Sequence, residues 1–339
     1  MALSSLPETE TSEEAASYVR SLTEHVESEL QTFSLPYEPA ELYEPVRYVL
    51  AGGGKRIRPL LVLLAAEAFG GEEARERAMP AALAVEVFHN FTLVHDDIMD
   101  HADERRGRPT VHVRWNEATA ILSGDLMMGH AYDLLAQVET GRTAEVIRIF
   151  HRMVARLCEG QALDMAFEQR VDVSVAAYLD MIERKTAALL EAALEIGALI
   201  GGADAEARTK LRSAGRDLGR AFQIQDDLLD LTADDAKWGK TIGGDLMEGK
   251  KTFLLLRALE CSEGKEHAWF ARIVEENGIA GDGVHEARTR METLGVLGDA
   301  RGVVEKHYRA GLAGLDVLPT GRASSALRGV VEGLMQRGR

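Results

Sequence analysis

Cysteine and proline are both scarce in this sequence. The 339 residues include two cysteines, Cys158 and Cys261, which lie far apart and do not form a CxxC spacing. Two isolated cysteines provide neither a disulfide framework nor a zinc site. Such scarcity is typical of proteins that work in a reducing compartment, so we expect a cytoplasmic location. The low proline count of 8 is typical of a helix-rich globular chain.

Long apolar runs are absent as well. The most apolar stretches, Pro59 to Phe69 and Val113 to Met128, are broken by charge or reach about half of the ~20 residues that a membrane-spanning helix needs. The N-terminus is acidic and polar and has no signal-peptide pattern. We therefore expect no membrane span, and we expect residues 1–13 to form a flexible leader.

Positive charge is in the minority. Lys and Arg number 39 against 55 Asp and Glu, which gives a formal net charge of −16. A protein whose main partner is nucleic acid needs a basic face, so we expect no nucleic-acid partner. An anionic small molecule is compatible with this balance, because a local cluster of cations or metal ions is enough to bind it.

The sequence does have strong helical periodicity. Apolar residues recur at steps of three and four, whereas convincing alternation at period two is absent. This pattern predicts an all-α bundle, with residues 14–339 in one domain. Glycine-rich breaks at residues 52–54, 70–71, 201–202 and 243–244 separate several of the helices. The predicted helices cover residues 14–33, 60–78, 80–101, 116–138, 143–169, 174–201, 205–231 and 251–261. The stretch 262–302, rich in glycine and charge, is predicted to be peripheral.

Two acidic motifs with the same spacing end two apolar segments. The first contains Asp96, Asp97 and Asp100, and the second, in FQIQDDLLD, contains Asp226, Asp227 and Asp230. Helical geometry places the first and last aspartate of each motif on one face, where their charges repel unless a cation lies between them. Mg²⁺ prefers oxygen ligands and keeps coordination positions for substrate phosphates. The repeated motif therefore predicts a metal-bound diphosphate rather than a solvated helix end.

Basic residues accompany these motifs. Several lie beside glycine turns or directly after the acidic motifs, and together they indicate a second diphosphate held by cations without a metal. Each cluster alone is also compatible with a simple role in surface solubility. The residues concerned are Lys55, Arg58, Arg105, Arg106, Lys240, Lys250 and, together with Thr186, Lys185.

The order of the motifs resembles a known family. GGGKRIRP, HDDIMDHADERRGRPTVH, ERKTAALL, FQIQDDLLD and GKTIGGDLMEGKKT follow one another between residues 52 and 252. This set is similar to that of the trans-type isoprenyl diphosphate synthases, the polyprenyl synthetase family. The resemblance implies the isoprenoid synthase fold, a large helical bundle around a central cavity, and a homodimer. It also implies Mg²⁺-dependent head-to-tail condensation of isopentenyl diphosphate with an allylic diphosphate (dimethylallyl, geranyl or farnesyl).

The same resemblance implies residue roles. Asp96, Asp100 and Asp226 would be direct ligands of three Mg²⁺ ions, and Asp97, Asp227 and Asp230 would complete the acidic shell. The allylic diphosphate would be bound by Arg105, Lys185, Lys240 and Lys250. Isopentenyl diphosphate would be bound by Lys55, Arg58, His89 and Arg106. Thr186 and Gln223 would line the site near the developing carbocation. For His89, a satisfied core histidine is the alternative, and Arg337 and Arg339 in the C-terminal tail are left without a role.

Chain length is predicted from the residues that precede the first acidic motif. Phe91 lies five positions before Asp96, which is roughly 7 Å along a helix at 1.5 Å per residue, so its ring can stop a growing chain. Thr92 is small, and the motif has no insertion between its aspartates. By resemblance, this combination implies geranylgeranyl diphosphate (C20) as the main product. Phe88, one turn deeper, would reinforce the stop or serve only in the core.

Other products and activities fit parts of the same pattern. Farnesyl diphosphate (C15) and a mixture of C15, C20 and C25 products are alternatives within the same reaction. A terpene cyclase would use the acidic motif but would not need GGGKRIRP or the paired arginines. A non-catalytic partner subunit would be expected to lose aspartates, and this chain retains all six.

Overall fold

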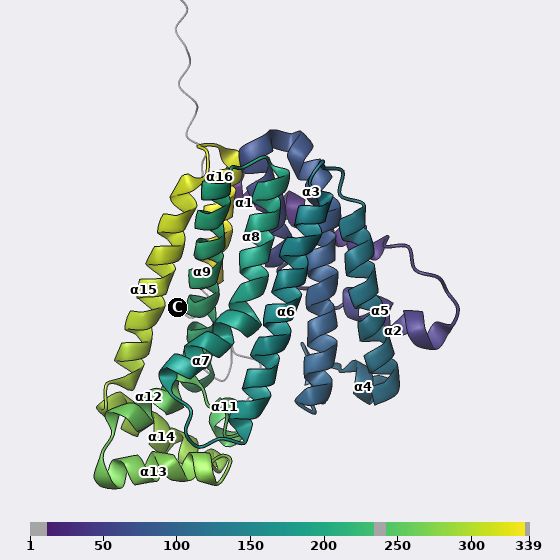
Figure 1. Ribbon diagram of the computed structural model, residues 1–339. Helices are drawn as coiled ribbons and strands as arrows, with labels where there is room; N and C mark the ends of the chain where they lie inside the picture. Colours follow the sequence, from purple (N-terminus) through teal and green to yellow (C-terminus); the bar gives the residue numbers. More distant parts are fainter. Residues whose placement is uncertain (1–11, 234–241, 336–339) are drawn as a thin grey trace, which may run out of the picture. The chain divides into compact units, whose positions relative to one another are not determined.

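The computed structural model describes residues 12–233 and 242–335, and this part of the chain is almost entirely helical (Figure 1). Its one sheet is an antiparallel hairpin of two short strands, β1 (Glu104–Arg105) and β2 (Arg108–Pro109). The helices before the hairpin are α1 (Ser12–Gln31), α2 (Ala40–Leu50) and α3 (Ile57–Met99). Those that follow are α4 (Val111–Arg114), α5 (Glu117–Ala136), α6 (Thr143–Glu168), α7 (Val175–Ile182), α8 (Ala188–Ile200), α9 (Ala205–Thr232), α11 (Gly244–Met247), α12 (Phe253–Cys261), α13 (Gly264–Glu275), α14 (Gly281–Thr293), α15 (Val296–Gly314) and α16 (Arg322–Met335).

The chain forms two compact units, each built from segments that are distant in sequence. Among the described residues, the first unit comprises residues 12–149, 193–208 and 318–330, and the second comprises residues 150–192, 209–233, 242–317 and 331–335. The all-α prediction is confirmed. The expectation that residues 14–339 form one domain stays a prediction.

Helix α3 is the centre of the first unit. Every residue from Leu60 to Ala66 is buried, and α5 packs along α3 while α1 and α2 cover other parts of it (Figure 1). Periodicity predicted a break between two helices at residue 79, whereas the glycine-rich pattern predicted one at residues 70–71, and the second prediction is confirmed. The structure has a kink at Gly71, whose φ of 69° and ψ of −168° are not helical, and Pro80 stays inside the second half of the helix. A backbone with positive φ is readily adopted by glycine, which explains why the kink lies there.

The core of the second unit is built from late segments of the chain. Phe253 to Leu256 in α12 are buried together with Phe270 of α13 and Met291 of α14. The prediction that residues 262–302 are peripheral was wrong, because these residues fold into α13, α14 and the start of α15 and supply part of this core. Their many charged side chains lie on the outer faces of short helices. The apolar positions between them therefore do not form a long periodic run in the sequence.

The predicted helix over residues 174–201 is interrupted by a π-helix, Glu183–Ala187, between α7 and α8. Neighbouring helices approach it closely at two glycines. A Cβ on Gly160 of α6 would lie 2.3 Å from the Lys185 nitrogen, and one on Gly219 of α9 would lie 2.5 Å from the Ala187 Cα. Short π segments within α-helices are frequent at functional sites. This one contains two predicted site residues, Lys185 and Thr186.

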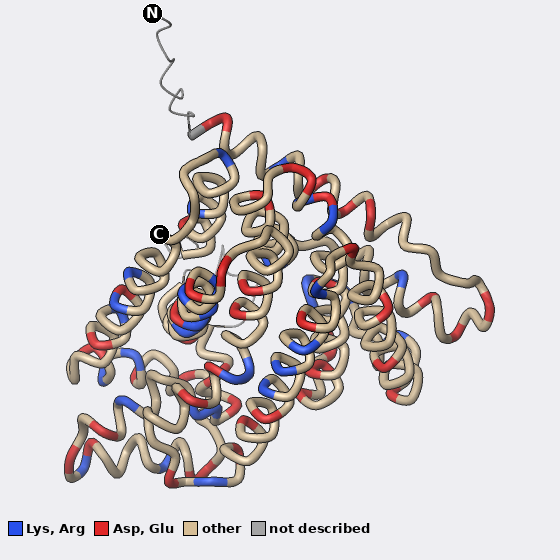
Figure 2. Tube along the Cα trace, turned by 45° about the horizontal axis from the view of Figure 1, so that its top comes forward, with Lys and Arg blue, Asp and Glu red and all other residues tan. Residues whose placement is uncertain are grey.

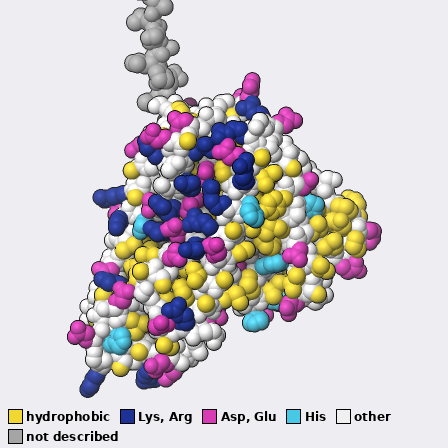
Figure 3. Space-filling view, in the orientation of Figure 1, with side chains coloured by type: hydrophobic (Ala, Val, Ile, Leu, Met, Phe, Trp, Pro, Cys, Tyr) yellow, Lys and Arg dark blue, Asp and Glu magenta, His cyan; other side chains and the backbone are white. Residues whose placement is uncertain are grey.

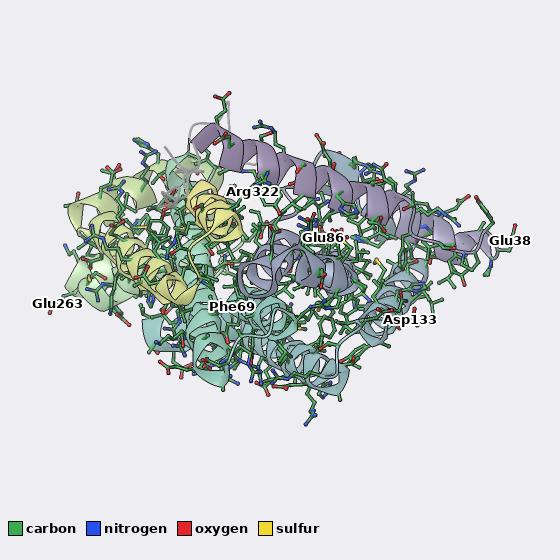
Figure 4. The ribbon with its side chains drawn as sticks, turned by 90° about the horizontal axis from the view of Figure 1, so that it is seen from above. Glu38, Phe69, Glu86, Asp133, Glu263 and Arg322 are labelled. Carbon is green, nitrogen blue, oxygen red and sulfur yellow. The ribbon has the colours of Figure 1, made fainter. Side chains whose placement is uncertain are left out.

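In the described part of the chain, no helix is both long and apolar enough to cross a membrane. Acidic and basic residues are scattered along the helices of the trace in Figure 2, with other residues between them. Some charged residues lie inside instead. Figure 4 shows Glu86 among the helices of the first unit, whereas Glu38 and Asp133 lie at its outer edge. Glu86 is 4% exposed, which requires a partner for its charge.

Candidate active site

The first acidic motif occupies the C-terminal end of α3. The Asp100 nitrogen donates to the Asp96 carbonyl at 2.8 Å, so these residues have the helical spacing that puts their side chains on one face. Asp97 differs from both, since it is 4% exposed and accepts a hydrogen bond of 2.7 Å from the Arg105 Nε. Burial raises the pKa of Asp97, although Arg105 opposes this effect. Asp97 therefore belongs to the interior of the first unit.

The paired arginines lie on the hairpin that follows. Arg105 pairs with Arg108 across the two strands, and the turn residues Arg106 and Gly107 have φ values of 54° and 69°. Two consecutive positive φ values are what a type I′ two-residue turn requires, and glycine at the second position favours it. The turn separates the two arginines. Arg105 reaches Asp97, while Arg106 donates from Nη1 to the Gly53 carbonyl.

A cationic cluster surrounds the glycine turn at residues 52–54. The Arg58 Nη1 lies 3.1 Å from the His89 Nε2. Because a guanidinium only donates, Nε2 must accept and the imidazole proton is on Nδ1. Burial, followed by the nearby guanidinium groups of Arg58 and Arg106, lowers the pKa of His89 well below its ordinary value. His89 is therefore neutral at neutral pH and has a hydrogen-bond partner in this cluster.

Glycine at position 54 allows Arg106 to join the cluster. A Cβ at Gly54 would lie 3.2 Å from the Arg106 Nη1, and the φ of Gly54 is 153°. Lys55 follows the turn directly and is exposed. The first unit thus brings Arg58, His89 and Arg106 to the glycine turn that precedes Lys55. Their role in binding isopentenyl diphosphate stays a prediction.

The neighbouring Arg56 has a different role, which the sequence did not reveal. Its side chain is 5% exposed and donates to the Glu86 Oε1 at 2.7 Å and to the Leu50 carbonyl at 3.2 Å. In the run KRIR, the side chain of Arg56 is therefore buried. No spacing rule distinguishes it from Lys55 or Arg58; the buried acid thirty residues later is the only signal.

The second acidic motif lies near the end of α9. Asp227 is 4% exposed and accepts from the Tyr178 Oη at 2.5 Å, the Phe253 nitrogen at 3.1 Å and the Gln223 Nε2 at 3.3 Å. Burial raises the pKa of Asp227 to about 6, although the three hydrogen bonds lower it. Asp230 accepts from the Asp245 nitrogen at 3.2 Å. In both motifs the second aspartate is thus the interior one.

The π-helix presents its residues to α6 and α9. The Lys185 Nζ lies 2.6 Å from the Asp164 Oδ2, and the Thr186 Oγ1 donates to the Gln223 Oε1 at 2.9 Å. Gln223 in turn donates to Asp227, so Thr186, Gln223 and Asp227 form one chain of contacts. Sequence reasoning missed Asp164 and Tyr178, because each is a single polar residue within a helix and belongs to none of the motifs used.

The two lysines of MEGKKT are separated by the fold. Lys250 is exposed and lies 2.8 Å from the Glu248 Oε2. Lys251 is buried and donates to the Glu168 carbonyl at 3.0 Å, so it links the segment before α12 to the end of α6. Lys240, Arg337 and Arg339 lie outside the described residues.

Two of the predicted chain-length residues, Phe88 and Phe91, form an aromatic row on α3 together with His95. The Phe91 ring centroid lies 5.3 Å from that of Phe88 and 4.6 Å from that of His95. Phe88 is fully buried, and the Thr92 Oγ1 donates to the His89 carbonyl at 2.8 Å. The small Thr92 therefore places no bulky side chain next to Phe91, five positions before Asp96.

Comparison with known proteins decides the family. The profile described as Polyprenyl synthetase matches residues 39–290, a span that contains every motif named above. The chain belongs to the polyprenyl synthetase family. Its resemblance to this family, its prenyltransferase class and its all-α isoprenoid synthase fold are thereby confirmed.

Individual members of the polyprenyl synthetase family resemble the chain over most of its length. It is 45% identical over 244 residues to a geranylgeranyl diphosphate synthase of Methanosarcina mazei, covering 71% of this chain and 75% of the relative. It is 39% identical over 323 residues to a geranylfarnesyl diphosphate synthase of Natronomonas pharaonis, covering 88% and 91%. The crystal structure of geranylgeranyl pyrophosphate synthetase from Pyrococcus horikoshii superimposes with a TM-score of 0.87 at 35% identity, covering 96% of this chain and 99% of that one.

Proposed function

We propose that this chain condenses isopentenyl diphosphate head-to-tail with allylic diphosphates and makes geranylgeranyl diphosphate (C20) as its main product. The observation that carries the proposal is the cluster of Arg58, His89 and Arg106 at one glycine turn in the first unit. A cluster of this kind suits a diphosphate bound by cations alone, which a condensing enzyme needs in addition to its metal-bound substrate. The names of the relatives in Methanosarcina mazei and Pyrococcus horikoshii support the C20 product.

Mg²⁺, three ions per active site, is the proposed cofactor. The donors fit it, because Asp96 with Asp100 and Asp226 with Asp230 are carboxylate pairs at helical spacing, and oxygen is the ligand that Mg²⁺ prefers. Asp97 and Asp227 act from behind these pairs, since their oxygens already accept hydrogen bonds from protein donors. When bound, Mg²⁺ offsets the negative charge that develops on the departing diphosphate.

The allylic diphosphate is proposed to contact Arg105, Lys185, Lys240 and Lys250 as well as the metal ions. These cations stabilise the leaving group while the allylic carbon–oxygen bond breaks. Asp164 holds the Lys185 ammonium, and Asp97 holds the Arg105 guanidinium, so both cations are kept in position before substrate binds. The oxygens of Thr186 and Gln223, which bond each other, provide dipoles for the carbocation.

Isopentenyl diphosphate is proposed to bind Lys55, Arg58, His89 and Arg106. The neutral imidazole of His89 would donate from Nδ1 to a diphosphate oxygen, since its Nε2 accepts from Arg58. The double bond of isopentenyl diphosphate attacks the allylic carbocation and a carbon–carbon bond forms. A proton then leaves, and the released diphosphate accepts it. Exclusion of water protects the carbocation from quenching.

Phe91 is proposed to end chain growth, with Phe88 behind it and the small Thr92 leaving it unobstructed. One alternative product pattern has a specific observation in its favour. The relative in Natronomonas pharaonis is named a geranylfarnesyl diphosphate synthase, so a C25 component beside C20 is the first alternative, and C15 is the second. The Arg58–His89 cluster makes a terpene cyclase the weaker candidate, because a cyclase has no second diphosphate to bind.

A homodimer in the cytoplasm completes the proposal. Ile121 and Leu122 on α5 are 40% and 60% exposed, and hydrophobic side chains gather over this helix in Figure 3. An exposed apolar face on a rigid helix suits a subunit interface. Cys158 and Cys261 are both free thiols, which suits a reducing compartment.

The test is product chain length. Purified protein is incubated with Mg²⁺, labelled isopentenyl diphosphate and each allylic starter in turn, and the dephosphorylated products are separated against prenyl alcohol standards. We expect mainly the C20 alcohol. A ladder of C15 or of C25 and longer products would remove the chain-length argument but keep the reaction. No incorporation with any starter would favour the cyclase or the partner subunit.

A further inference from the structure

The hairpin that contains Arg105 and Arg106 is too short to hold its own geometry. Each strand has two residues, and an isolated two-stranded hairpin is at best marginally stable in water. Arg105 and Arg106 bond outward, to Asp97 and to the Gly53 carbonyl. Something must therefore fix the second strand, β2, relative to the glycine turn.

Tyr48, near the end of α2, makes that connection. Its hydroxyl donates to the Pro109 carbonyl at 2.8 Å, and its own carbonyl accepts from the Arg108 Nη2 at 3.3 Å. The Arg108 guanidinium carbon lies 3.9 Å from the Tyr48 ring centroid, and the Arg114 carbon lies 4.4 Å from it. Trp115 meets the ring edge-on at 5.3 Å. One side chain is thus attached to β2 and to the segment after it.

The connection lies beside the cationic cluster. Tyr48, Gly52, Arg106 and Arg108 line a common pocket, which Asp97 also borders. Arg106 bonds the turn at the Gly53 carbonyl, Arg108 bonds the Tyr48 carbonyl of α2, and Pro109 accepts from the Tyr48 hydroxyl, so three bonds tie the hairpin to this region. Loss of the Tyr48 side chain would remove the hydrogen bond to Pro109 and the ring contact of Arg108, so the strand that follows Arg106 would be held less firmly.

We propose that Tyr48 and Arg108 are positioning residues, which fix the Arg106 guanidinium at the glycine turn and thereby set the affinity for isopentenyl diphosphate. This inference rests on the proposed function of that cluster. Neither residue belongs to the predicted diphosphate-binding sets. Both act through Arg106, so their effects should depend on each other.

The test combines kinetics with binding. We expect Tyr48→Leu to raise KM for isopentenyl diphosphate about tenfold, because a guanidinium displaced by a fraction of an ångström loses bidentate geometry. The kcat at saturating substrate and KM for the allylic diphosphate should change less than about threefold. Tyr48→Phe keeps the ring over Arg108 and should recover most of the affinity. Tyr43→Leu, the same change elsewhere on α2, is the control and should leave both KM values unchanged.

A double-mutant cycle separates positioning from direct binding. If Arg108 acts through Tyr48, Arg108→Lys should add little to Tyr48→Leu. Additive increases in KM would mean that Arg108 contacts the substrate and would overturn the assignment. An unchanged KM in folded Tyr48→Leu, or equal losses in every kinetic constant, would overturn it as well.

Binding of inorganic diphosphate without Mg²⁺, measured by calorimetry, makes the test independent of turnover. We expect the affinity for diphosphate to weaken about tenfold in Tyr48→Leu but not in Tyr43→Leu, and this result would support the connection. It would do so even if the wild-type chain incorporated no isopentenyl diphosphate. That failure would count against the proposed function alone. Equal affinity in wild type and Tyr48→Leu would reject the connection. Arg108→Lys gives the same readout if Tyr48→Leu does not fold.

Discussion

The Tyr178 hydroxyl donates to the Asp227 Oδ2 at 2.5 Å, from a helix that precedes Asp227 by almost fifty residues. Together with donors from Phe253 and Gln223, it makes the second aspartate of this motif a buried acceptor. The neighbouring aspartates at positions 226 and 230 are only half-buried. Aspartates that look equivalent in the sequence therefore differ in what surrounds them.

This difference predicts unequal effects of substitution. Asp226→Asn should lower kcat/KM by about a hundredfold or more and raise the Mg²⁺ concentration needed for half-maximal rate, because it removes a charge proposed to hold metal. Asp227→Asn should cost about tenfold and leave the Mg²⁺ requirement nearly unchanged. Steady-state rates at varied Mg²⁺ decide between them. Equal shifts in the Mg²⁺ requirement of Asp226→Asn and Asp227→Asn would refute the distinction between the two aspartates. Asp96→Asn and Asp97→Asn allow the same comparison in the first motif.

Phe91→Ala should lengthen the product. Removal of the ring opens space on α3 next to Phe88, so products beyond C20 should appear in the chromatographic assay. Phe69→Ala, the same change on the other side of the kink in α3, is the control and should not alter chain length. If Phe91→Ala still stops at C20, Phe91 is not the end of the chain-binding space, and Phe88→Ala becomes the next variant to assay.

The buried pair of Arg56 and Glu86 predicts a stability effect. Glu86→Leu should lower the free energy of unfolding by about 3 kcal/mol, since it leaves a buried guanidinium without its carboxylate. The double variant Arg56→Met with Glu86→Leu should recover much of this loss, because both charges are gone. Glu27→Ala removes the more exposed partner of Arg56, at 3.8 Å, and should change stability by less than about 0.5 kcal/mol. Urea unfolding measures all three, and a double variant as unstable as Glu86→Leu would contradict the explanation.

Tyr18 predicts how stability falls at alkaline pH. Burial, followed by its hydrogen bond to Glu67, raises the pKa of Tyr18 from 10.0 to about 12. Above pH 10 the unfolded chain loses this proton while the folded chain keeps it. The folded state therefore binds more protons than the unfolded state, and stability decreases as pH rises. The contribution of Tyr18 to the free energy of unfolding is about 2 to 3 kcal/mol. It is fully present below pH 10 and is lost as the pH rises through 12.

Tyr18→Phe should remove this part of the pH dependence. Denaturant unfolding between pH 8 and pH 11 measures it, and the slope of stability against pH should become shallower than in wild type. Tyr37→Phe is the control, because Tyr37 is 83% exposed. The same slope in wild type and Tyr18→Phe would show that other groups cause the alkaline loss.

Long periodic segments predicted most of the fold. The predicted stretch 205–231 corresponds to α9, which ends at Thr232, and 143–169 corresponds to α6. Periodicity failed where the helix is irregular or short. The kink at Gly71 depends on a positive φ, the π-helix at Glu183–Ala187 lies where the backbones of α6 and α9 approach closely, and the charged side chains of α13 and α14 obscure their apolar positions.

The sequence motifs predicted which residues belong to the candidate site. They did not predict the contacts that each of these residues makes. Lys250 and Lys251 are adjacent and chemically identical, yet one is exposed and the other donates to a buried carbonyl. Arg56 is likewise indistinguishable from Arg58 until Glu86 is located in space. Burial and partner geometry are tertiary properties, so spacing along the chain does not encode them.

The π-helix changes what one helical segment can reach. Tyr178 and Lys185 are seven residues apart, and a regular helix at 3.6 residues per turn would turn both toward the same neighbour. With the wider turn beginning at residue 183, Tyr178 reaches Asp227 of α9 and Lys185 reaches Asp164 of α6. Deleting Arg184 would retain Lys185 and Thr186 but turn Lys185 away from Asp164. A change in register alone, with every functional side chain retained, would then be enough to inactivate the enzyme.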